Sequence, residues 1–367
     1  MKFLRLAFYV LVAQLVLSGC AGEAVEETSS SSSSEINFDA YVGRDASTRS
    51  SVTDINFLKR DIENTYNAGF GVFAIYRHTD KTILPLMLMN NEHVHWKKWK
   101  GDHFDWGYEN TRYWPNEGSV DFYAFAPRSA EPKLDSLDNF EINFSANWSP
   151  VDLVYAKAEG KTKTDTPVKF TFEHALARLS FDITANPKLE KNGAVIKVKE
   201  VKLYGADETS GIFLMGGHLN LKTGDWTPYN NNISWFYTWT PEGKKDDIQK
   251  APTDSIVYKL SASQLDDKTD SITNDADSYI FIIPQEKPAN FNLKIIYTVK
   301  QGDFEEEVTV KKNLLDILPP EDSNHPFFKG GKAYVFHLKL SLDPVNFDVQ
   351  ATVGDWIGKV VDDKITI

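Results

Sequence analysis

Apolar residues recur at every second position in several stretches of this chain. The clearest run places five of them two residues apart: Phe291, Leu293, Ile295, Tyr297 and Val299. Residues 334–342 and 345–353 repeat the pattern. Successive side chains of a β-strand point to opposite faces, so a period of two predicts strands that each pack one face against a core. The chain is therefore predicted to be all-β.

Composition and turn residues favour antiparallel sheets. Aromatic residues make up 13% of the chain, and Val, Ile, Thr, Phe and Tyr dominate its apolar runs. Gly, Asn and Asp separate these runs, as is typical of strands joined by turns. Further strands are predicted at residues 36–41, 70–76, 120–126, 151–156, 168–184, 195–204, 218–221 and 278–283. Together they predict two antiparallel β-sandwich domains in tandem.

A shift in composition predicts where these domains meet. The length of the chain favours two domains, each large enough to bury a core without disulfides. The polar sequence around Asn186-Pro187 and 190–193 favours an N-terminal domain over residues 36–190 and a C-terminal domain over residues 191–367. The Trp-rich and Asn-rich stretch 222–256 is predicted to be a long decorated loop region.

The first twenty residues are predicted to be a signal peptide. Two basic residues precede an apolar stretch over residues 6–17, which is too short to span a bilayer. The sequence LSGC follows at 17–20 and resembles the lipobox of bacterial lipoproteins. This resemblance predicts cleavage between Gly19 and Cys20 and acylation of the Cys20 thiol, which anchors the chain to a lipid bilayer. Ala21 in the next position favours the outer membrane.

Residues 21–35 are predicted to be a flexible tether. They include a run of six serines, Ser29 to Ser34, and have little to bury. Fully extended, this segment reaches about 50 Å, enough to hold a domain clear of a lipid surface. Cys20 is the only cysteine, which excludes an intrachain disulfide framework and a Cys-based metal cage.

Charge and motifs argue against nucleic-acid binding and against metal chemistry. The formal net charge is −12, and no cluster of Lys and Arg offsets it. His93 and His95 share one strand face, with Asp102 and His103 nearby, which is a conceivable ligand set. No third ligand arrives at a recognisable spacing and Lys97 is among the neighbouring cations, so a polar strand edge is favoured and no metal is expected.

Catalytic chemistry finds no support either. Asp102, Asp105 and Glu109 could be read as a glycosidase carboxylate pair, but their separation in sequence fixes no geometry. The chain has no G-x-S-x-G elbow, no phosphate-binding glycine loop and no H-E-x-x-H sequence. His174 lies in an aromatic strand, where a structural histidine is the default. No catalytic residue and no cofactor are expected, and the chain is predicted not to be an enzyme.

A series of short motifs, read in order, resembles the fimbrillin family of pilus subunits. The motifs are YWP (113–115), VDFYAFAP (120–127), DLVYA (152–156), VKFTFEHALARL (168–179), LNLKTGDW (219–226), IPQ (283–285), GKAYVFHLKL (331–340) and VGDW (353–356). Each is little more than a strand and a turn, but their order is specific. The resemblance extends from about residue 36 to the end.

The resemblance implies a fold and a mode of assembly. Members of the fimbrillin family have two transthyretin-like β-sandwich domains and are structural or accessory subunits of cell-surface fimbriae that support cell adhesion. They reach the outer membrane as lipidated precursors. An arginine-specific protease then removes the N-terminal strand, and the C-terminal strand of another fimbrillin subunit fills the groove in a homo- or hetero-polymer. Strand addition of this kind uses main-chain hydrogen bonds for affinity and side-chain pockets for register.

Two segments match that mechanism. Residues 46–50, ASTRS, resemble the cleavage loop, which predicts maturation between Arg49 and Ser50, with Arg44 as the second choice, and a removable strand over residues 36–49. The tail over residues 357–367 would span about 37 Å as a strand and is the predicted donor strand. Its apolar residues on one face are Val361, Ile365 and Ile367. Pairing of the tail within its own domain is the alternative.

Two other readings remain open. A glycan-binding outer-membrane lipoprotein would also have a serine tether, β-sandwiches and surplus tryptophan, because sugar faces stack on exposed indole rings. Exposure of Trp226, Trp235 and Trp239 as one platform would favour it. The second alternative is a pilus tip or anchor subunit, and a host or glycan ligand is a possible further partner.

Overall fold

The structure is a computed structural model, and residues 35–367 form one compact unit in it. The residues that it describes are 34–42, 53–60, 68–98, 102–129, 132, 134, 136–145, 152–185, 194–229, 237–240, 258–260, 270–273, 280–317, 327–340 and 348–355. In this part of the chain, no helix is long and apolar enough to cross a membrane.

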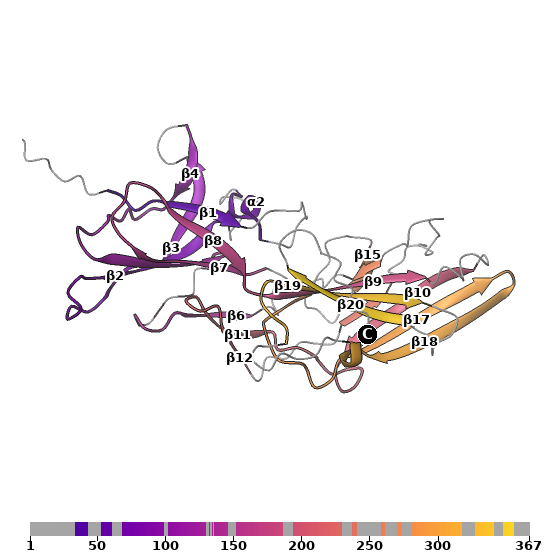
Figure 1. The fold of residues 1–367 in the computed structure, drawn as a ribbon. Coiled ribbons are helices and arrows are strands. Elements are labelled where there is room, and N and C mark those ends of the chain that lie inside the picture. The colour runs from indigo at the N-terminus through magenta and orange to yellow at the C-terminus, as the bar shows by residue number, and fades with distance from the viewer. Residues whose placement is uncertain are drawn as a thin grey trace, which may run out of the picture. The chain divides into compact units, whose positions relative to one another are not determined.

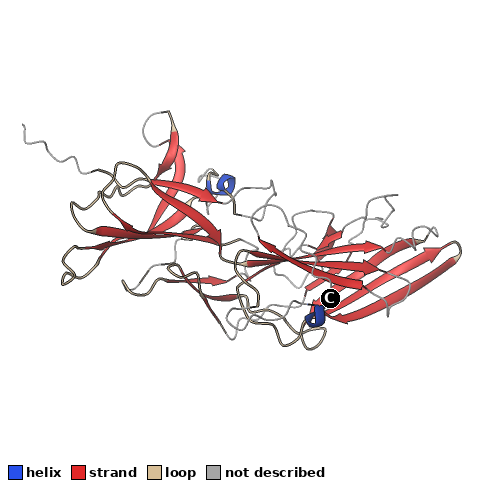
Figure 2. Cartoon of the chain, in the orientation of Figure 1, coloured by secondary structure: helices blue, strands red, loops and turns tan. Residues whose placement is uncertain are grey.

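Nearly all regular structure in the described residues is β-strand, with two helical turns (Figure 2). The elements are β1 (Phe38–Val42), α2 (Ile55–Leu58), β2 (Phe70–Arg77), β3 (Leu86–Lys98), β4 (Phe104–Gly107), β5 (Ser119–Ala126), β6 (Glu141–Ser145), β7 (Val154–Lys161), β8 (Val168–His174), β9 (Ala177–Ala185), β10 (Val195–Tyr204), β11 (Gly216–Asn220), β12 (Trp226–Pro228), β13 (Tyr237–Thr240), β14 (Tyr258–Leu260), β15 (Asp270–Thr273), β16 (Ile280–Ile282), β17 (Asn292–Gln301), β18 (Phe304–Asn313), η1 (Leu314–Ile317), β19 (Lys332–Leu340) and β20 (Asp348–Asp355). The all-β class predicted from the period of two is confirmed.

The first sheet has seven strands in the order β1-β8-β7-β5-β2-β3-β4 (Figure 1). Every pairing in it is antiparallel except that of β1 with β8. β2 lies between β5 and β3, and its first six residues are buried whichever way they point. A strand covered on both faces has a continuous apolar sequence, which is what Phe70 to Ile75 show.

The second sheet joins ten strands. Nine follow the order β18-β17-β10-β13-β15-β14-β9-β19-β20, and β16 pairs with β9 beside this path. Two pairings are parallel, β13 with β15 and β9 with β19. Along β17, Leu293, Ile295, Tyr297 and Val299 are all buried. The alternation that is clearest in the sequence therefore marks a core strand.

The region predicted as one strand over residues 168–184 is two strands in different sheets. β8 ends at His174, β9 begins at Ala177, and β8 belongs to the first sheet while β9 belongs to the second. The predicted boundary at residues 190 and 191 lies outside the described residues. β9, which precedes it, pairs with β19 near the C-terminal end of the described chain.

A small third sheet connects distant parts of the sequence. Its order is β12-β11-β6, so residues 216–220 pair with residues 141–145. A core cluster contains Phe140 and Ile142 together with Leu219 and Leu221, and it also includes Phe73 of the first sheet. The other two clusters draw on residues 36–172 and residues 177–351. Each large sheet thus has its own buried cluster, with the third cluster drawing on residues from both halves of the chain.

Candidate functional site

Among the described strands, β1 is an edge strand with a single partner. It pairs in parallel with β8 (Figure 1). The register runs from Phe38 opposite Val168 to Val42 opposite Phe172. An edge strand is held by one ladder of main-chain hydrogen bonds and by its side chains, so it can be exchanged without breaking a second ladder. The other neighbours in this sheet pair in antiparallel fashion.

The side chains of this segment alternate between a closed slot and the surface. Ile36, Phe38 and Val42 have exposed fractions of 0%, 2% and 4%. Ala40 faces the same way but is only half-buried, whereas Tyr41 on the other face is 50% exposed. Positions two residues apart share one face of a strand, so residues 36–42 insert four successive side chains toward the core.

Aromatic rings line the slot that receives Phe38. The ring centroids of Tyr108, Phe122 and Phe170 lie 5.6, 5.7 and 5.7 Å from that of Phe38. Phe170 comes from β8 and Phe122 from β5, whereas Tyr108 directly follows β4. We refer to the edge of β8 together with Tyr108, Phe122 and Phe170 as the β1 groove. Burial of a phenylalanine among such rings stabilises the attachment by several kcal/mol, since Phe→Ala changes in cores cost about 3–5 kcal/mol.

Main-chain groups at the start of the segment are bound as well. The Ile36 N–H donates to the Arg112 carbonyl at 2.8 Å, and the Val168 N–H donates to the Asn37 carbonyl at 2.8 Å. The Tyr108 hydroxyl donates to the Ile36 carbonyl, also at 2.8 Å. Burial raises the pKa of Tyr108 to about 12, so this hydroxyl keeps its proton at physiological pH. The segment is thus tied to the groove at its entry as well as along its length.

A second group of contacts fixes the chain soon after β1. Residues 43–52 lie outside the described residues, and Thr53 is the first described residue after them. Its N–H donates to Asp152 Oδ2 at 2.9 Å, and its hydroxyl donates to the Asp152 carbonyl at 2.5 Å. His174 Nδ1 lies 2.9 Å from the same carboxylate oxygen. We refer to Thr53, Asp152 and His174 as the Asp152 clasp.

The clasp is buried and specific. Asp152 has no exposed surface, and a buried carboxylate is stable only when it is hydrogen-bonded. Asp152 lies in the DLVYA motif and His174 ends the strand of the FTFEH motif, so two of the motifs behind the family resemblance meet at Thr53. The segment 43–52 therefore begins next to a buried strand and ends next to a buried clasp.

The residues predicted to carry maturation and assembly all lie outside the described residues. These are Gly19, Cys20, Arg44, Arg49, Ser50, Val361, Ile365 and Ile367. What the structure describes is the strand that would be removed, from Ile36 to Val42, and the groove that holds it. Tyr108 and Thr53, which hold the two ends of this region, have no local sequence signal, because their partners lie 72 and 99 residues away.

The histidines considered as metal ligands lie close together on β3. The ring centroids of His93 and His95 are 4.9 Å apart, and His93 Nε2 is 2.8 Å from the Ala68 carbonyl. Burial lowers the pKa of His93 and lowers that of His95 to about 4, so both rings are neutral at pH 7. His103 is exposed. Among the described residues, no group of three or more His, Cys, Asp and Glu side chains could hold a metal ion.

The tryptophan platform can be assessed only at Trp226. Its indole N–H donates to the Ala175 carbonyl at 2.9 Å, and its ring packs edge-on against Phe144 with centroids 6.0 Å apart. Trp226 is half-buried and serves to connect β12 with the third core cluster. Trp235 and the side chain of Trp239 lie outside what the structure describes.

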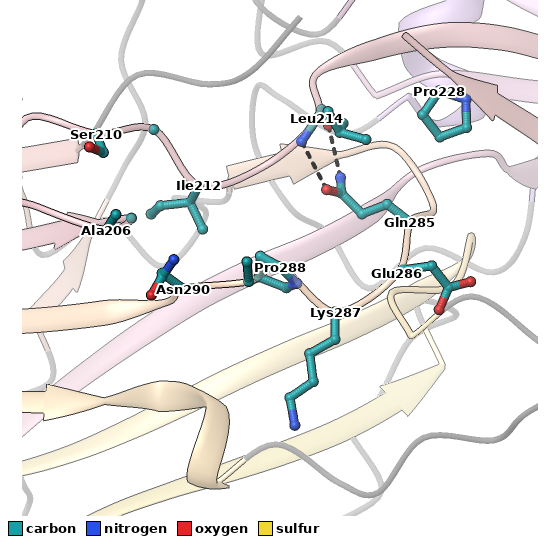
Figure 3. Close-up of a pocket in the computed structure, with 13 residues that line it drawn as sticks. Ala206, Ser210, Ile212, Leu214, Pro228, Gln285, Glu286, Lys287, Pro288 and Asn290 are labelled. Carbon is teal, nitrogen blue, oxygen red and sulfur yellow. Dashed lines mark hydrogen bonds between the residues drawn. The ribbon is translucent and has the colours of Figure 1, made fainter. Parts of the chain in front are cut away.

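A hollow of 450 Å³ lies between the loop after β10 and the loop before β17 (Figure 3). Gln285 lies beside it, but its side-chain amide accepts from the Leu214 N–H and donates to the Leu214 carbonyl, both at 2.8 Å. Its main chain also pairs with Phe328 in both directions. Gln285 of the IPQ motif thus joins three segments, and this accounts for its burial.

These features define the chain as an all-β protein whose first described strand is an edge strand seated in an aromatic groove. Residues 48–356 match the model of the fimbrillin-like family. The chain belongs to this family. No curated protein matches the chain.

The chain is similar to several solved structures, and three of them illustrate the range of likeness. A fimbrial protein from Bacteroides vulgatus shares 21% identity over 88% of this chain and 99% of its own, with a TM-score of 0.58. A putative cell adhesion protein from Bacteroides uniformis shares 18% identity over 78% and 91%, with a TM-score of 0.44. The tip fimbrial protein Mfa3 from Porphyromonas gingivalis, with C-terminal truncation, shares 10% over 79% and 96%, with a TM-score of 0.31. The first likeness shows that the fold of this chain is also that of a fimbrial protein.

Proposed function

We propose that this chain is a structural or accessory subunit of a cell-surface pilus and assembles by protease-triggered strand exchange. Membership in the fimbrillin-like family and the shared fold of a Bacteroides vulgatus fimbrial protein support a role in a fimbrium that serves adhesion. The proposed partners are other subunits of the same family, and the proposed role is not catalytic.

One observation carries the proposal: residues 36–42 fill a groove that belongs to the rest of the fold. Among the described strands β1 pairs with β8 alone, and three of the four inward side chains of residues 36–42 are almost fully buried. The chain that connects β1 to the clasp at Thr53 contains Arg49. A cut after Arg49 would therefore leave β1 held by noncovalent contacts, while Thr53 keeps the new N-terminus in place. Loss of β1 would leave an unpaired edge on β8 and an open aromatic slot, both of which a strand from another subunit can complete.

The route to the surface follows from the N-terminal sequence. Cleavage between Gly19 and Cys20 and acylation of Cys20 would deliver a precursor to the outer membrane. An arginine-specific protease at the cell surface would then separate the assembled subunit from its lipid anchor, because Arg49 follows Cys20 in the chain. Residues 357–367 are the proposed donor strand.

The test uses residues 21–367, which retain every described element. Purified protein is treated with a low dose of an arginine-specific protease, and its mass and size are followed together. Such a protease is preferable to trypsin, because Lys359 and Lys364 lie in the donor segment. Cleavage at Arg49 followed by a ladder of heat-resistant and SDS-resistant oligomers is the expected result.

Two variants make the test specific. The double variant Arg44→Gln/Arg49→Gln should remain monomeric under the same treatment, because a cut after Arg44 would also free β1, whereas Arg44→Gln alone should be cut after Arg49 and polymerise like the parent. Cleavage at Arg49 that leaves the protein monomeric would contradict strand exchange and would favour a tip or anchor subunit. The position of Trp226 does not support a sugar-binding platform, so the glycan-binding alternative has no structural observation in its favour among the described residues.

A further inference from the structure

The β1 groove fixes which side chains a replacement strand must present. The four inward positions of the present occupant are Ile36, Phe38, Ala40 and Val42, and only that of Ala40 is not closed off from solvent. A charged side chain at any of the other three positions would be buried among apolar groups without a partner, which is strongly unfavourable. The groove therefore accepts three apolar side chains and tolerates a polar one only at the third position.

The proposed donor segment carries one charge on its apolar face. The side chains that share that face are Val361, Asp363, Ile365 and Ile367. Asp363 is the second of the four when the segment is read forward and the third when it is read backward. The direction in which the segment enters thus decides where this carboxylate goes.

A donor strand that runs parallel to β8 would bury a charged side chain at one of the closed positions of the groove. With Val361 at the position of Ile36, Asp363 falls in the aromatic slot of Phe38, where the nearest rings are within 6 Å. Moving the segment by two residues brings Asp363 to the position of Ala40. That register puts Lys359 at the fully buried position of Ile36.

A donor strand that runs antiparallel to β8 would place its three apolar side chains at the closed positions and Asp363 at the half-open one. Ile367 then takes the position of Ile36, and Ile365 enters the slot of Phe38. Val361 replaces Val42, and Asp363 coincides with the half-open position of Ala40. Shifting the antiparallel segment by two residues in either direction moves Asp363 to a closed position.

We propose that residues 361–367 of a second copy enter the β1 groove antiparallel to β8, opposite to the direction of β1, with Asp363 in place of Ala40. This inference rests on the proposed strand exchange and specifies its geometry. It replaces the parallel pairing seen between β1 and β8 with an antiparallel one. The first sheet of the assembled subunit then becomes antiparallel in all its described pairings.

Disulfide trapping distinguishes the two directions. Lys169 and Thr171 point outward from β8, opposite Asp39 and Tyr41 of the present strand. In the antiparallel register Thr171 lies opposite Asp362, and in the parallel register it lies opposite Thr366. These two positions are about 13 Å apart along a strand, whereas cysteines with Cα atoms more than about 7 Å apart cannot be bridged. Lys169 lies opposite Lys364 in both directions and serves as the positive control.

The experiment uses pairs of single-cysteine variants of residues 21–367, which otherwise contain no cysteine. One member carries T171C or K169C, and the other carries D362C, T366C or K364C. Each pair is mixed, cut with the arginine-specific protease, allowed to polymerise, oxidised, and then dissociated without reductant in a denaturant strong enough to return the cysteine-free parent polymer to monomers. Each variant alone controls for contacts that do not involve the groove.

The expected result is a disulfide-linked dimer from T171C with D362C and from K169C with K364C, and none from T171C with T366C. A dimer from T171C with T366C, or from T171C with K364C, would overturn the antiparallel register while leaving strand exchange intact. If polymers form but no pair gives a dimer, including the control pair, the donor is not residues 361–367 and the proposed assembly fails at that point. Absence of polymers would contradict the proposed function itself.

Discussion

The Asp152 side chain lies at the boundary between the N-terminal segment that is proposed to be removed and the rest of the fold, which must remain intact. Its Oδ2 atom binds Thr53 and His174, whereas no hydrogen bond from the described residues reaches its Oδ1 atom. The Asp152 clasp binds Thr53, which follows the segment that is proposed to be removed and begins the part of the chain that must stay folded. A cut in residues 43–52 would free the chain on one side, while the buried carboxylate restrains the chain on the other.

Removal of this carboxylate should destabilise the whole fold. Asp152→Ala leaves the Thr53 N–H and the His174 ring without their buried partner, and breaking such contacts costs about 3 kcal/mol. The free energy of unfolding, measured by urea titration, should fall by about that amount. Asp102→Ala is the control, because Asp102 is exposed and forms a surface ion pair with Lys98, so its effect should stay within about 0.5 kcal/mol. Equal losses in the two variants would contradict the role assigned to the clasp.

His95 should make the stability of the fold depend on pH. Burial lowers its folded-state pKa to about 4, whereas the unfolded pKa is about 6.5. Between these values the unfolded chain binds a proton that the folded chain excludes, so stability is full above pH 6.5 and is lost as the pH falls toward 4. Urea midpoints at pH 7.5 and pH 4.5 should differ less for His95→Gln than for the parent. His103→Gln, at an exposed histidine, should show the same difference between the two urea midpoints as the parent. If that difference were reduced in His103→Gln and not in His95→Gln, His95 would not be the cause of the pH dependence.

At the scale of elements, sequence patterns predicted strands best where two neighbours and a buried face enforce alternation. β17 pairs with β10 and β18 and shows the period of two over its length. β3 was predicted only as a polar strand edge around His93 and His95, because irregular pairing with β2 and an Asn91 with a positive φ of 59° interrupt its alternation. β18 was missed, since it is an edge strand and three of its exposed residues are glutamates: Glu305, Glu306 and Glu307.

The candidate site was predictable only in part. Arg49 and the tail 357–367 were identified by resemblance to the fimbrillin family, and they remain predictions. The groove itself depends on long-range contacts such as that of Tyr108 with Ile36, which no local pattern reveals. Likewise, the turn at residues 175–176 divides an apolar run between two sheets, and only the pairing partners of β8 and β9 distinguish them.

Truncation of Phe38 should loosen β1 selectively. Phe38→Ala removes the side chain that contacts three aromatic rings, and such a loss costs about 3–5 kcal/mol at a buried site. Hydrogen exchange at the amides of β1 and at the Val168 amide should accelerate much more than exchange in β17. Tyr41→Ala is the matched control, because Tyr41 lies on the exposed face of the same strand. If both variants exchange alike, the side-chain slot does not hold the strand.

At the scale of the whole molecule, the described strands leave four edges in the two large sheets. They are β1 and β4 in the first and β18 and β20 in the second. β18 carries a run of glutamates, including Glu307, which pairs with Lys199 at 2.6 Å, and charge on an edge discourages pairing with other chains. β20 directly precedes the proposed donor segment. Assembly through β1 and the tail would thus engage one edge and one terminus of each subunit, which is the arrangement that an open polymer requires.

Deletion of the tail should convert a subunit into a chain terminator. A protein without residues 360–367 keeps every described element, so it should fold and be cut at Arg49, but it should not polymerise alone. Mixed with the parent before cleavage, it should occupy polymer ends and shorten the SDS-resistant ladder in proportion to its share. Unchanged polymer length in the mixture, measured by gel densitometry, would contradict the assignment of the donor.

The covalent link between β1 and Thr53 has a kinetic consequence. A strand joined to its groove by a short segment competes at an effective concentration in the millimolar range. A strand from another molecule at lower concentration can displace it only if that strand binds the groove correspondingly more tightly. Once the segment is cut, β1 is diluted into the surroundings when it dissociates, and the same groove becomes open to other copies. In the proposed assembly, proteolysis would therefore control when and where subunits join by changing a concentration, without any change in the groove itself.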